Sequence, residues 1–449
     1  MNTVDPVIVL PLQKHRVNPA LSESPVLRYF TFAALYLAQG IPEGLTFFAI
    51  PAWMAMNGKT PAEIGSFAAV VIIPWTFKIV VAPLMDRFSF LSMGRRRPWV
   101  LFGQLGLVLT FFSMAFISDP LNHLPALMFA GFWVSFFGAF QDIAVDGMAI
   151  DIIPPNQQAR ANGIMWGSKT AGISVSLAVG SWFINSYGFA YAVVALSSVV
   201  LLIMLIPLFI KERTGEKLLP WTQGEASEHS KNIQLESWKH IFESLRKVMF
   251  LKSSLLMAFA IFGCGFTFNL MNTLLPVFTI QEIGWTDISY SQITATANIT
   301  GGLLGMMIGG ILVDHFGKKR MIHTYLLLLI LLVSVVCFQR EFWHSKTFIA
   351  GFIILYYLLY TFITIAVFAI CMQLCWKRVA ATQFTLFMTI HNIGYALGAR
   401  SLGSLKSMLE WQFVLFVIAI IAAVIIAITW FIKLDAHVIK VEELEKNYF

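Results

Sequence analysis

Residues 82–99, APLMDRFSFLSMGRRRPW, and residues 309–322, GGILVDHFGKKRMI, carry the same features in the same order. In each stretch an Asp closes an apolar segment, and a Gly and three basic residues follow it. Asp86 and Asp314 lie about half of the 449-residue chain apart. Two related halves are typical of transporters that hold their site between repeats. The repeat therefore predicts a chain built from two similar units.

The composition places the chain in a membrane. Hydrophobic residues make up 58% of it and charged residues 12%, whereas soluble domains have about 45–50% and about 25%. The mean hydropathy is +0.74. A net charge of +7 is compatible with nucleic acid binding, but most Lys and Arg lie in short segments beside apolar spans, where they determine orientation. We expect the lipid bilayer as a partner and no nucleic acid.

A helix needs about 20 mostly apolar residues to cross a bilayer. Twelve segments of the chain satisfy this requirement: 28–56, 62–86, 97–117, 124–152, 158–185, 188–211, 252–282, 287–316, 320–339, 346–376, 380–405 and 410–433. The first segment is long, and Gly40, Pro42 and Gly44 predict a break in it. The expected fold class is an all-α membrane protein, with twelve transmembrane helices in two pseudo-symmetric six-helix bundles.

The spans divide the chain into five parts. These are a tail (1–27), a bundle (28–211), a linker (212–251), a second bundle (252–433) and a tail (434–449). In the linker, the apolar spacing that starts at Ile233 predicts an amphipathic helix on the membrane surface. Most Lys and Arg fall on the side of both termini, so the positive-inside rule places the termini and the linker in the cytoplasm.

The two repeated loops predict a gate at the cytoplasmic ends of the bundles. An Asp at a helix end, followed by basic residues, can form a network that holds the two bundles together, and breaking that network would open the inner side. The alternative is that the basic residues only anchor the loops beside the membrane. The gate residues that we expect are Asp86, Arg87, Arg95, Arg96, Arg97, Asp146, Asp314, Lys318, Lys319 and Arg320.

The repeated loops and the six-plus-six spans resemble the major facilitator superfamily. A finer resemblance is to the AmpG-type muropeptide permeases and the related acetyl-CoA transporters. It is carried by AQGIPEGL (38–45), FKIVVAPLMDRFSFLSMGRRRPW (77–99), QDIAVDGMAIDIIP (141–154) and ATQF (381–384). The resemblance implies a secondary transporter in a bacterial inner membrane, with its solute site between the bundles.

This chain departs from the resembled permeases at two places. Relatives usually have an apolar residue where Glu43 stands, and muropeptide permeases carry an aromatic and a basic residue where Met148 and Ala149 stand. A muropeptide is the solute that the resemblance implies. The alternatives are an acyl-CoA-like solute, or a drug or metabolite that moves outward in exchange for protons.

Ionisable residues inside the first-half spans are candidates for the transport pathway. A charge there costs roughly 2.5–3.5 kcal/mol, so such residues usually face a cavity or a partner. Glu43 is expected to bind a proton or the solute; the alternative is a protonated Glu bonded to backbone freed by Pro42. Lys169 lies near the middle of its span, which indicates a place on the cavity. Lys78 either extends to the surface or pairs with Asp142 or an anionic solute.

Asp142 and Asp146 are four residues apart and share one helix face. Two close carboxylates do not ionise easily together, so one of them is expected to keep a proton. For Asp146 we favour pairing with the arginines of the gate. For Asp142 a place in the gate and a place on the pathway remain equally open.

Polar residues of the second-half spans complete the predicted pathway. His391 can carry a proton, although a lone His in a span is often a satisfied core group. Asn269, Asn272 and Gln373 can hydrogen-bond a sugar or peptide, or can only join helices. The full predicted pathway for solute and protons is Gln39, Glu43, Lys78, Asp142, Lys169, Asn269, Asn272, Gln373, His391 and Asn392.

Other classes of function find little support in the sequence. The four Cys residues lie in apolar stretches and predict neither a disulfide nor a metal site, and we expect no cofactor. The sequence contains no HExxH, GxSxG or P-loop motif, so an enzyme is not expected. We expect a proton-coupled secondary transporter that works as a monomer on a small-molecule solute.

Overall fold

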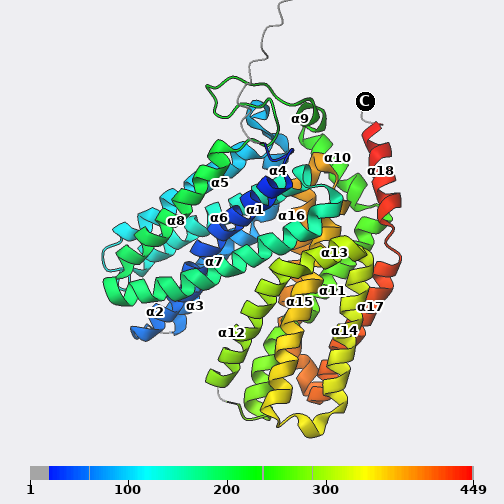
Figure 1. The fold of residues 1–449 in the computed structure, drawn as a ribbon. Helices are drawn as coiled ribbons and strands as arrows, with labels where there is room; N and C mark the ends of the chain where they lie inside the picture. The colour runs from blue at the N-terminus through cyan, green and yellow to red at the C-terminus, as the bar shows by residue number, and fades with distance from the viewer. Residues whose placement is uncertain (1–19, 60, 235–236, 286, 447–449) are drawn as a thin grey trace, which may run out of the picture.

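The computed structural model describes residues 20–59, 61–234, 237–285 and 287–446. Long helices form two groups, one from each half of the sequence, and a linker joins them (Figure 1). In Figure 1 the two groups meet near the linker and diverge towards the opposite end. We call the end that carries the linker and the C-terminal helix the linker end, and the opposite end the far end.

The first half contains the helices before the linker. They are α1 (Pro25–Glu43), a π-helical turn η1 (Gly44–Ala49), α2 (Ile50–Met56), α3 (Pro61–Thr76), α4 (Lys78–Arg87), α5 (Arg97–Ser113), α6 (Leu124–Ile152), α7 (Gln158–Tyr187) and α8 (Phe189–Phe209). Pro25 and Pro98 stand in the first turns of α1 and α5, where the missing N–H would have no helical partner. The linker holds two short helices, α9 (Glu228–Ile233) and α10 (Trp238–Met249).

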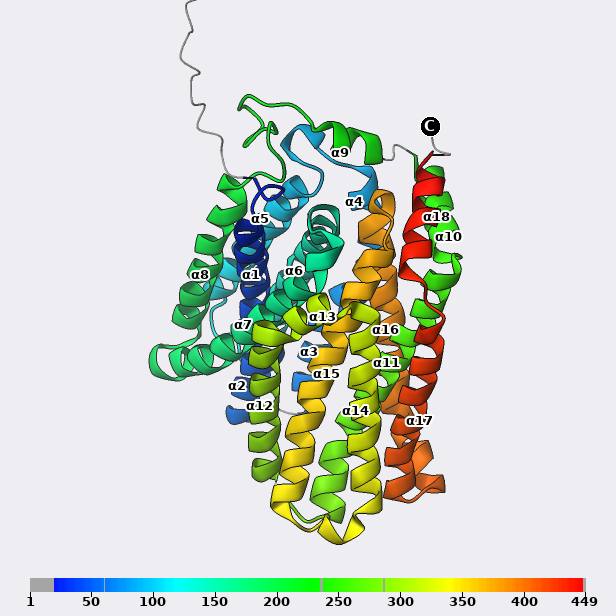
Figure 2. The ribbon, with the colours of Figure 1, turned by 45° about the vertical axis from the view of Figure 1, so that its right-hand side comes forward.

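The second half repeats the arrangement of the first. Its helices are α11 (Lys252–Val277), a π-helical turn η5 (Phe278–Glu282), α12 (Asp287–Leu304), a π-helical turn η6 (Gly305–Gly309), α13 (Gly310–Phe316), α14 (Lys318–Phe338), α15 (Lys346–Leu374), α16 (Ala380–Met408) and α17 (Trp411–Trp430). A 3-10 turn, η8 (Lys377–Val379), joins α15 to α16, and α18 (Leu434–Lys446) follows α17. Figure 2 shows α9, α10 and α18 gathered at the linker end.

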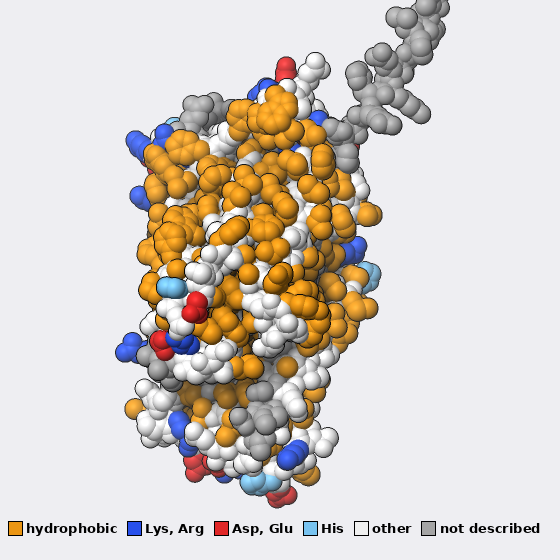
Figure 3. Space-filling view, turned by 90° about the vertical axis from the view of Figure 1, so that its left-hand side faces the viewer, with side chains coloured by type: hydrophobic (Ala, Val, Ile, Leu, Met, Phe, Trp, Pro, Cys, Tyr) orange, Lys and Arg blue, Asp and Glu red, His pale blue; other side chains and the backbone are white. Residues whose placement is uncertain are grey.

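Ten spans in the described part of the chain are long and apolar enough to cross a membrane. The predicted fifth and eleventh spans are the helices α7 and α16, which fall outside those ten. Both are long but carry polar residues, and both contact the other half, α7 through η6 and α13 and α16 through α4 and α6. On the flank shown in Figure 3, hydrophobic side chains predominate, and the few charged side chains lie mostly along its edges and at its lower end. The all-helical fold predicted from the sequence is confirmed.

The predicted break in the first span is wrong. The helix continues through Pro42 and widens into the π-helical turn η1. The glycines are explained by close packing instead: a Cβ at Gly40 would lie 2.2 Å from the carbonyl oxygen of Lys169, and one at Gly44 would lie 2.5 Å from that of Ile173. Only glycine therefore lets α1 approach α7 so closely.

The same helix α7 also packs against the second half. A Cβ at Gly163 would lie 2.8 Å from the carbonyl oxygen of Gly305, and one at Gly310 would lie 2.4 Å from that of Ala159. These glycines belong to the predicted fifth and eighth spans, which therefore cross at backbone distance. Small residues permit such a close contact between the two halves.

The linker helix α10 packs part of its apolar face against the protein, and its predicted place on the membrane surface stays a prediction. Ile241 and Val248 are buried in a small core with Trp376 and Val379 at the η8 turn. Val441 of α18 packs against the same core. The apolar spacing of the linker is therefore explained by contacts within the protein.

Candidate functional site

A chamber of about 200 Å³ lies between the two halves and is lined by two lysines and two aspartates. The first half contributes Tyr36, Trp75, Lys78, Asp142, Asp146, Trp166 and Lys169, and the second half contributes Phe368, Phe384, Thr385, Met388, Thr389, His391 and Asn392. The predicted pathway residues Lys78, Asp142 and Lys169 thus come together, although they lie on three different helices. We call this space the charged chamber.

Acid–base pairs neutralise the charges of this chamber. Lys78 forms an ion pair with Asp142, which also accepts a hydrogen bond of 2.8 Å from the amide of Gln39. Lys169 lies 2.8 Å from a carboxylate oxygen of Glu43. All four of these charged groups are largely shielded from solvent, so each depends on its partner.

Glu43 reaches the charged chamber only through Lys169. Its carboxylate pairs with that lysine, but Glu43 is absent from the described residues that line the chamber. The prediction that Glu43 itself lines the cavity is therefore corrected. The close packing of α1 on α7 places the pair, because Gly40 brings the two backbones together next to Lys169.

Two tryptophans that the sequence analysis missed hold the lysines. The Lys78 ammonium lies 4.3 Å from the centre of the Trp75 ring, and the Lys169 ammonium lies 4.8 Å from the same ring and 5.3 Å from that of Trp166. Each tryptophan precedes its lysine by three residues, in WTFK (75–78) and WGSK (166–169). This spacing puts the ring and the ammonium on one helix face and was a signal in the sequence.

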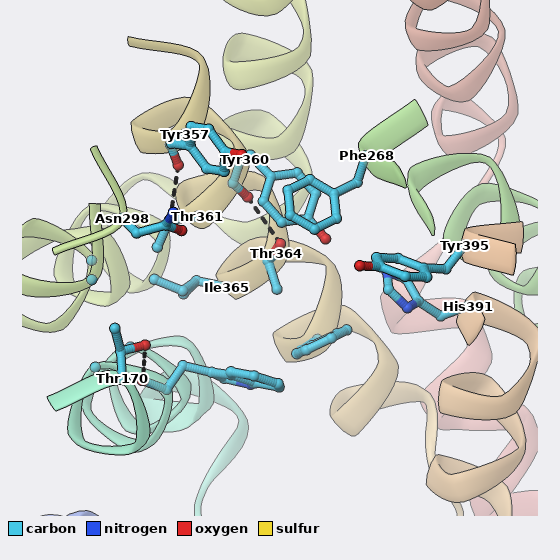
Figure 4. Close-up of a pocket in the computed structure, with 16 residues that line it drawn as sticks. Thr170, Phe268, Asn298, Tyr357, Tyr360, Thr361, Thr364, Ile365, His391 and Tyr395 are labelled. Atoms are coloured by element: carbon cyan, nitrogen blue, oxygen red, sulfur yellow. Dashed lines mark hydrogen bonds between the residues drawn. The ribbon is translucent and has the colours of Figure 1, made fainter. Parts of the chain in front are cut away.

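A second chamber, of about 300 Å³, adjoins the first (Figure 4). Aromatic and hydroxyl side chains dominate its walls, among them Thr170, Phe268, Tyr357, Tyr360, Thr361, Thr364 and Tyr395. The rings of Phe268 and Tyr360 are stacked. Trp166, Phe368 and His391 line both chambers, which therefore adjoin each other across these three side chains. We call the second space the aromatic chamber.

The predicted pathway residues of the second half separate into two groups. His391 and Asn392 line the chambers, and their role in the pathway stays a prediction. Asn269 donates a hydrogen bond of 2.9 Å to the carbonyl oxygen of Tyr395, and Asn272 accepts one of 2.6 Å from the Tyr357 hydroxyl. These two amides join helices and support chamber residues without lining either chamber.

Gln373 belongs to the linker end, not to the pathway. Its side-chain oxygen accepts a hydrogen bond of 2.9 Å from Lys318, and it lines a separate cavity below α9 and α18. Gln373 lies in the last turn of α15, so its side chain is at the linker end and away from the chambers. The expectation that Gln373 contacts the solute is therefore corrected.

Asp86 closes the linker end from the first half. It is fully buried and accepts hydrogen bonds of 2.8 and 2.6 Å from the backbone N–H and the hydroxyl of Thr382, at the start of α16 in the other half. Arg96 pairs with the same carboxylate. A carboxylate at a helix N-terminus is stabilised by the free N–H groups and the helix dipole. Asp86 thus joins the halves.

Asp314 makes the equivalent contact from the second half. Its two oxygens accept hydrogen bonds of 3.2 and 3.0 Å from the backbone N–H groups of Ala159 and Arg160, at the start of α7. Lys318 adds a hydrogen bond of 3.0 Å to Gln158 across the interface. Each repeated Asp therefore caps a helix of the opposite half, and the site is closed at the linker end.

The three consecutive arginines make different sets of contacts. Arg96 binds Asp86, and Arg95 crosses to the second half, where it donates to the carbonyl oxygens of Lys377 and Arg378. Arg97 donates to four backbone carbonyls at the end of α8 and in the linker, at Pro207, Leu208, Lys217 and Leu218. Arg97 therefore holds the linker and does not join the two halves, contrary to the prediction.

Asp146 is not part of the gate. It accepts a hydrogen bond from the Tyr36 hydroxyl and lines the charged chamber. Asp151 is buried and takes that place, with ion pairs to Arg95 (3.1 Å) and Arg96 (3.3 Å). The prediction chose the wrong carboxylate on α6 because the sequence does not fix how deep the arginines reach.

Three further predicted gate residues have other roles. Arg87 lies over the rings of Phe88 and Trp238 and so contacts the linker helix. Lys319 donates to backbone carbonyls at the end of α17, including that of Ile432 at 2.9 Å. Arg320 is exposed. None of these three joins the two halves within the described contacts.

A buried carboxylate of the linker supports the loop that carries Arg95, Arg96 and Arg97, which we call the arginine loop. Glu212 accepts hydrogen bonds from the backbone N–H groups of Arg95, Arg96 and Arg97. Burial nevertheless raises the pKa of Glu212 above its usual range. Burial and the neighbouring Glu212 raise the pKa of Glu216 to about 8. The linker is therefore folded onto the gate and is not a free tether.

Within the described residues, no cluster of three or more His, Cys, Asp or Glu side chains is placed to hold a metal ion. The chemistry that the site offers is different. It presents two lysines that can bind an anion, carboxylates that can take up protons, and aromatic rings on which the rings of a solute can stack. These groups line two adjoining chambers between the halves, and the Asp86 and Asp314 contacts join the halves at the linker end.

Comparisons with known proteins agree with this arrangement. Residues 32–399 match the family model described as the Major Facilitator Superfamily. The anhydromuropeptide permease of Escherichia coli (strain K12) is 24% identical over 367 residues, which cover 80% of this chain and 70% of that protein.

Among solved structures, the Major Facilitator Superfamily transporter FucP in the outward conformation superposes with a TM-score of 0.66 at 14% identity, over 90% of this chain and 98% of its own. A bacterial homologue of the iron transporter ferroportin in an outward-facing state gives a TM-score of 0.64 at 12% identity, over 90% of this chain and 98% of its own. At these identities the structures establish the fold.

Proposed function

Because the chain belongs to the Major Facilitator Superfamily, it is a secondary transporter and not an enzyme, and we propose that it moves an anionic, sugar- and peptide-containing solute of the muropeptide kind together with protons. The observation that carries this proposal is the pair of adjoining chambers. One offers paired lysines and carboxylates, and the other offers aromatic rings and hydroxyl groups.

The two chambers suit the two parts of such a solute. A peptide carboxylate would bind the ammonium groups of Lys78 and Lys169, which the Trp75 ring holds side by side. A sugar ring would stack on Phe268 and Tyr360 and bond to nearby hydroxyl groups. The similarity to the anhydromuropeptide permease supports this class of solute.

The Glu43–Lys169 pair is the proposed point of proton coupling. While Glu43 is ionised, its carboxylate occupies Lys169. Protonation removes that charge, so the lysine becomes available to an anionic solute. Binding of the proton and binding of the anion then favour each other, which is the thermodynamic requirement for moving both in one direction.

Transport follows from the gate. The linker end is closed by the caps that Asp86 and Asp314 place on helices of the opposite half. We propose that these caps break when the halves rock, and that the linker end faces the cytoplasm of a bacterial inner membrane. The distribution of Lys and Arg supports this orientation. A monomer provides both halves of the site.

Uptake into proteoliposomes tests the proposal. Labelled anhydro-muropeptide would be supplied to the wild type and to Glu43→Gln, with and without an inward proton gradient. We expect the wild type to concentrate the solute only with the gradient. The Gln variant imitates the protonated state, so it should still exchange labelled for unlabelled solute but should lose the response to the gradient.

Glu225→Gln, which removes an exposed carboxylate of the linker, is the matched control and should behave as the wild type. Gradient-driven uptake that persists in Glu43→Gln would place proton coupling elsewhere, and Asp146→Asn would then be the next variant. Failure of the wild type to take up muropeptide, with uptake of an acyl-CoA thioester instead, would change the solute and leave the coupling scheme standing.

A further inference from the structure

The turn between α15 and α16 binds Arg95 of the first half. We call residues 374–379, which include η8, the corner. Arg95 inserts its guanidinium group against the carbonyl oxygens of Lys377 and Arg378. These are backbone acceptors, so their position depends on the shape of the corner and not on side-chain rotamers. Whatever holds the corner also determines how well Arg95 can bind.

The C-terminal helix α18 holds the corner from the other side. Glu445 accepts a hydrogen bond of 2.8 Å from the Arg378 side chain and one from the indole N–H of Trp376. The Arg378 side chain is 5% exposed and that of Glu445 is 31% exposed. His437, buried one turn into α18, contacts the carbonyl oxygen of Leu374 at 2.9 Å. Two successive parts of the corner are therefore fixed by α18.

Among the described hydrogen bonds, those of α18 reach the first half through this corner. Ile150 and Ile153 of the first half face Val438 and Val441 of α18 across a cavity of about 460 Å³. The apolar side of α18 instead packs with the linker helix α10 around Trp376. The polar contact route from α18 to the first half thus runs from Glu445 through Arg378 and the corner carbonyls to Arg95.

We propose that Glu445 is a positioning residue of the gate: through Arg378 and Trp376 it shapes the corner so that Arg95 can hold the linker end closed, which makes the C-terminal helix a regulator of the transport cycle. Release of α18 from the corner favours opening at the linker end. The inference rests on the proposed rocking of the two halves but not on the identity of the solute.

A cysteine inside the site can report on the gate. Thr389 lines the charged chamber on α16 and lies away from the corner. In a variant with Thr389→Cys and the four buried native cysteines changed to Ser, a membrane-impermeant thiol reagent added on the linker side reaches the new thiol only when the gate opens. The labelling rate thus measures opening across the whole gate and not loosening of α18.

Loss of Glu445 should raise that rate. We expect Glu445→Gln to label roughly three to ten times faster than the parent, because a charge-assisted contact to a buried arginine is lost. Glu445→Asp keeps the charge and should label at close to the rate of the parent. Glu443→Gln, an exposed neighbour on the same helix, is the matched control and should not change it. Equal rates in Glu445→Gln and Glu443→Gln would overturn the proposal.

Two further readouts keep the result unambiguous. If Glu445→Gln merely damages folding, its thermal unfolding temperature falls and labelling from the far side rises as well; a selective rise from the linker side is the outcome that supports the proposal. If Thr389→Cys never labels from the linker side in any variant, the rocking of the halves is wrong. If it labels at one rate in all variants, only the role of Glu445 is wrong.

Discussion

Asp86 and Asp314 occupy equivalent places in the two halves, and each caps a helix of the opposite half, yet their surroundings differ. Asp86 is fully buried and lies within reach of two guanidinium groups. Asp314 is only partly buried, and its hydrogen bonds come from two backbone N–H groups. The repeat thus preserves the cap, while the first half alone adds a buried network of Arg95, Arg96 and Asp151.

The comparison separates two physical roles. A cap on a helix end contributes about 1 kcal/mol and can be broken and remade during each cycle. A buried network of charges costs several kcal/mol to break at one member, because the others stay without a partner. We infer that the Asp314 side is the more easily opened half of the gate and that the Asp86 side holds the loop in shape.

The largest effect is expected from Asp86→Asn. It leaves Arg95 and Arg96 with a single common carboxylate, Asp151, and should cost roughly 3–5 kcal/mol of folding stability. Thermal unfolding in detergent and the yield of folded protein measure this. Asp119→Asn, an exposed change at the far end, is the control. A loss below about 1 kcal/mol would contradict the distinction between network and cap.

Asp314→Ala should have a smaller effect on stability and a clear effect on the gate. It removes two hydrogen bonds to the start of α7, which corresponds to about 1 kcal/mol. Opening at the linker end should then rise roughly fivefold, because that free energy changes an equilibrium by about this factor. Labelling of Thr389→Cys from the linker side measures it. A loss of stability as large as that of Asp86→Asn would show that the two halves are equivalent.

Lys318→Met should change stability less again. Lys318 bonds to the side chains of Gln158 and Gln373, and the described residues place no carboxylate within ion-pair distance of it. The charge of Asp314 acts on Lys318 from beyond that distance, but Asp314 keeps its two backbone hydrogen bonds, so we expect a loss of about 1 kcal/mol or less. Arg96→Met is the matching change in the other half and should cost several times more in the same unfolding measurement.

The smallest effect concerns pH and the linker that supports the arginine loop. The pKa of Glu216 is about 8 in the folded protein, above its usual value of about 4.3. The folded state therefore binds this proton more tightly than the unfolded state. The contribution of Glu216 to the free energy of unfolding is thus complete below about pH 4 and is lost as pH rises to about 8. The wild type should lose roughly 2–4 °C in unfolding temperature between pH 6 and pH 9.

Glu216→Gln removes this titration, so its unfolding temperature should fall less over the same pH interval. The backbone N–H of Arg213 can still donate to the amide oxygen, as it does to the carboxylate. Equal pH dependence in wild type and variant would assign the slope to other groups, with the neighbouring Glu212 as the first candidate.

Much of the site was visible in the sequence where the signal was local. Asp86, Asp314 and Lys318 were predicted at the gate because the repeated loops mark them. Lys78 and Lys169 were predicted at the cavity because a charge in an apolar span needs a partner. The tryptophans three residues before these lysines carried a usable signal, since that spacing places both groups on one helix face.

Other residues were beyond the reach of sequence patterns. Asp146 and Asp151 lie five residues apart on α6, and only the packed structure shows that the arginines reach the second and not the first. Glu212 supports residues more than a hundred positions earlier. The C-terminal tail forms a helix whose partner is the corner. In each case the partners are far apart in sequence, so no local pattern joins them.

The sequence by itself determined that this chain crosses a membrane many times, that it consists of two related halves, and where its scarce buried charges lie. Those properties are local: they follow from the apolar content of each segment and from the repetition of a motif. The tertiary structure alone decided which charge meets which, whether Gly40 breaks a helix or lets two helices touch, and how the linker and α18 support the gate. Such pairings depend on the depth and rotation of packed helices, and these are set by contacts between distant segments.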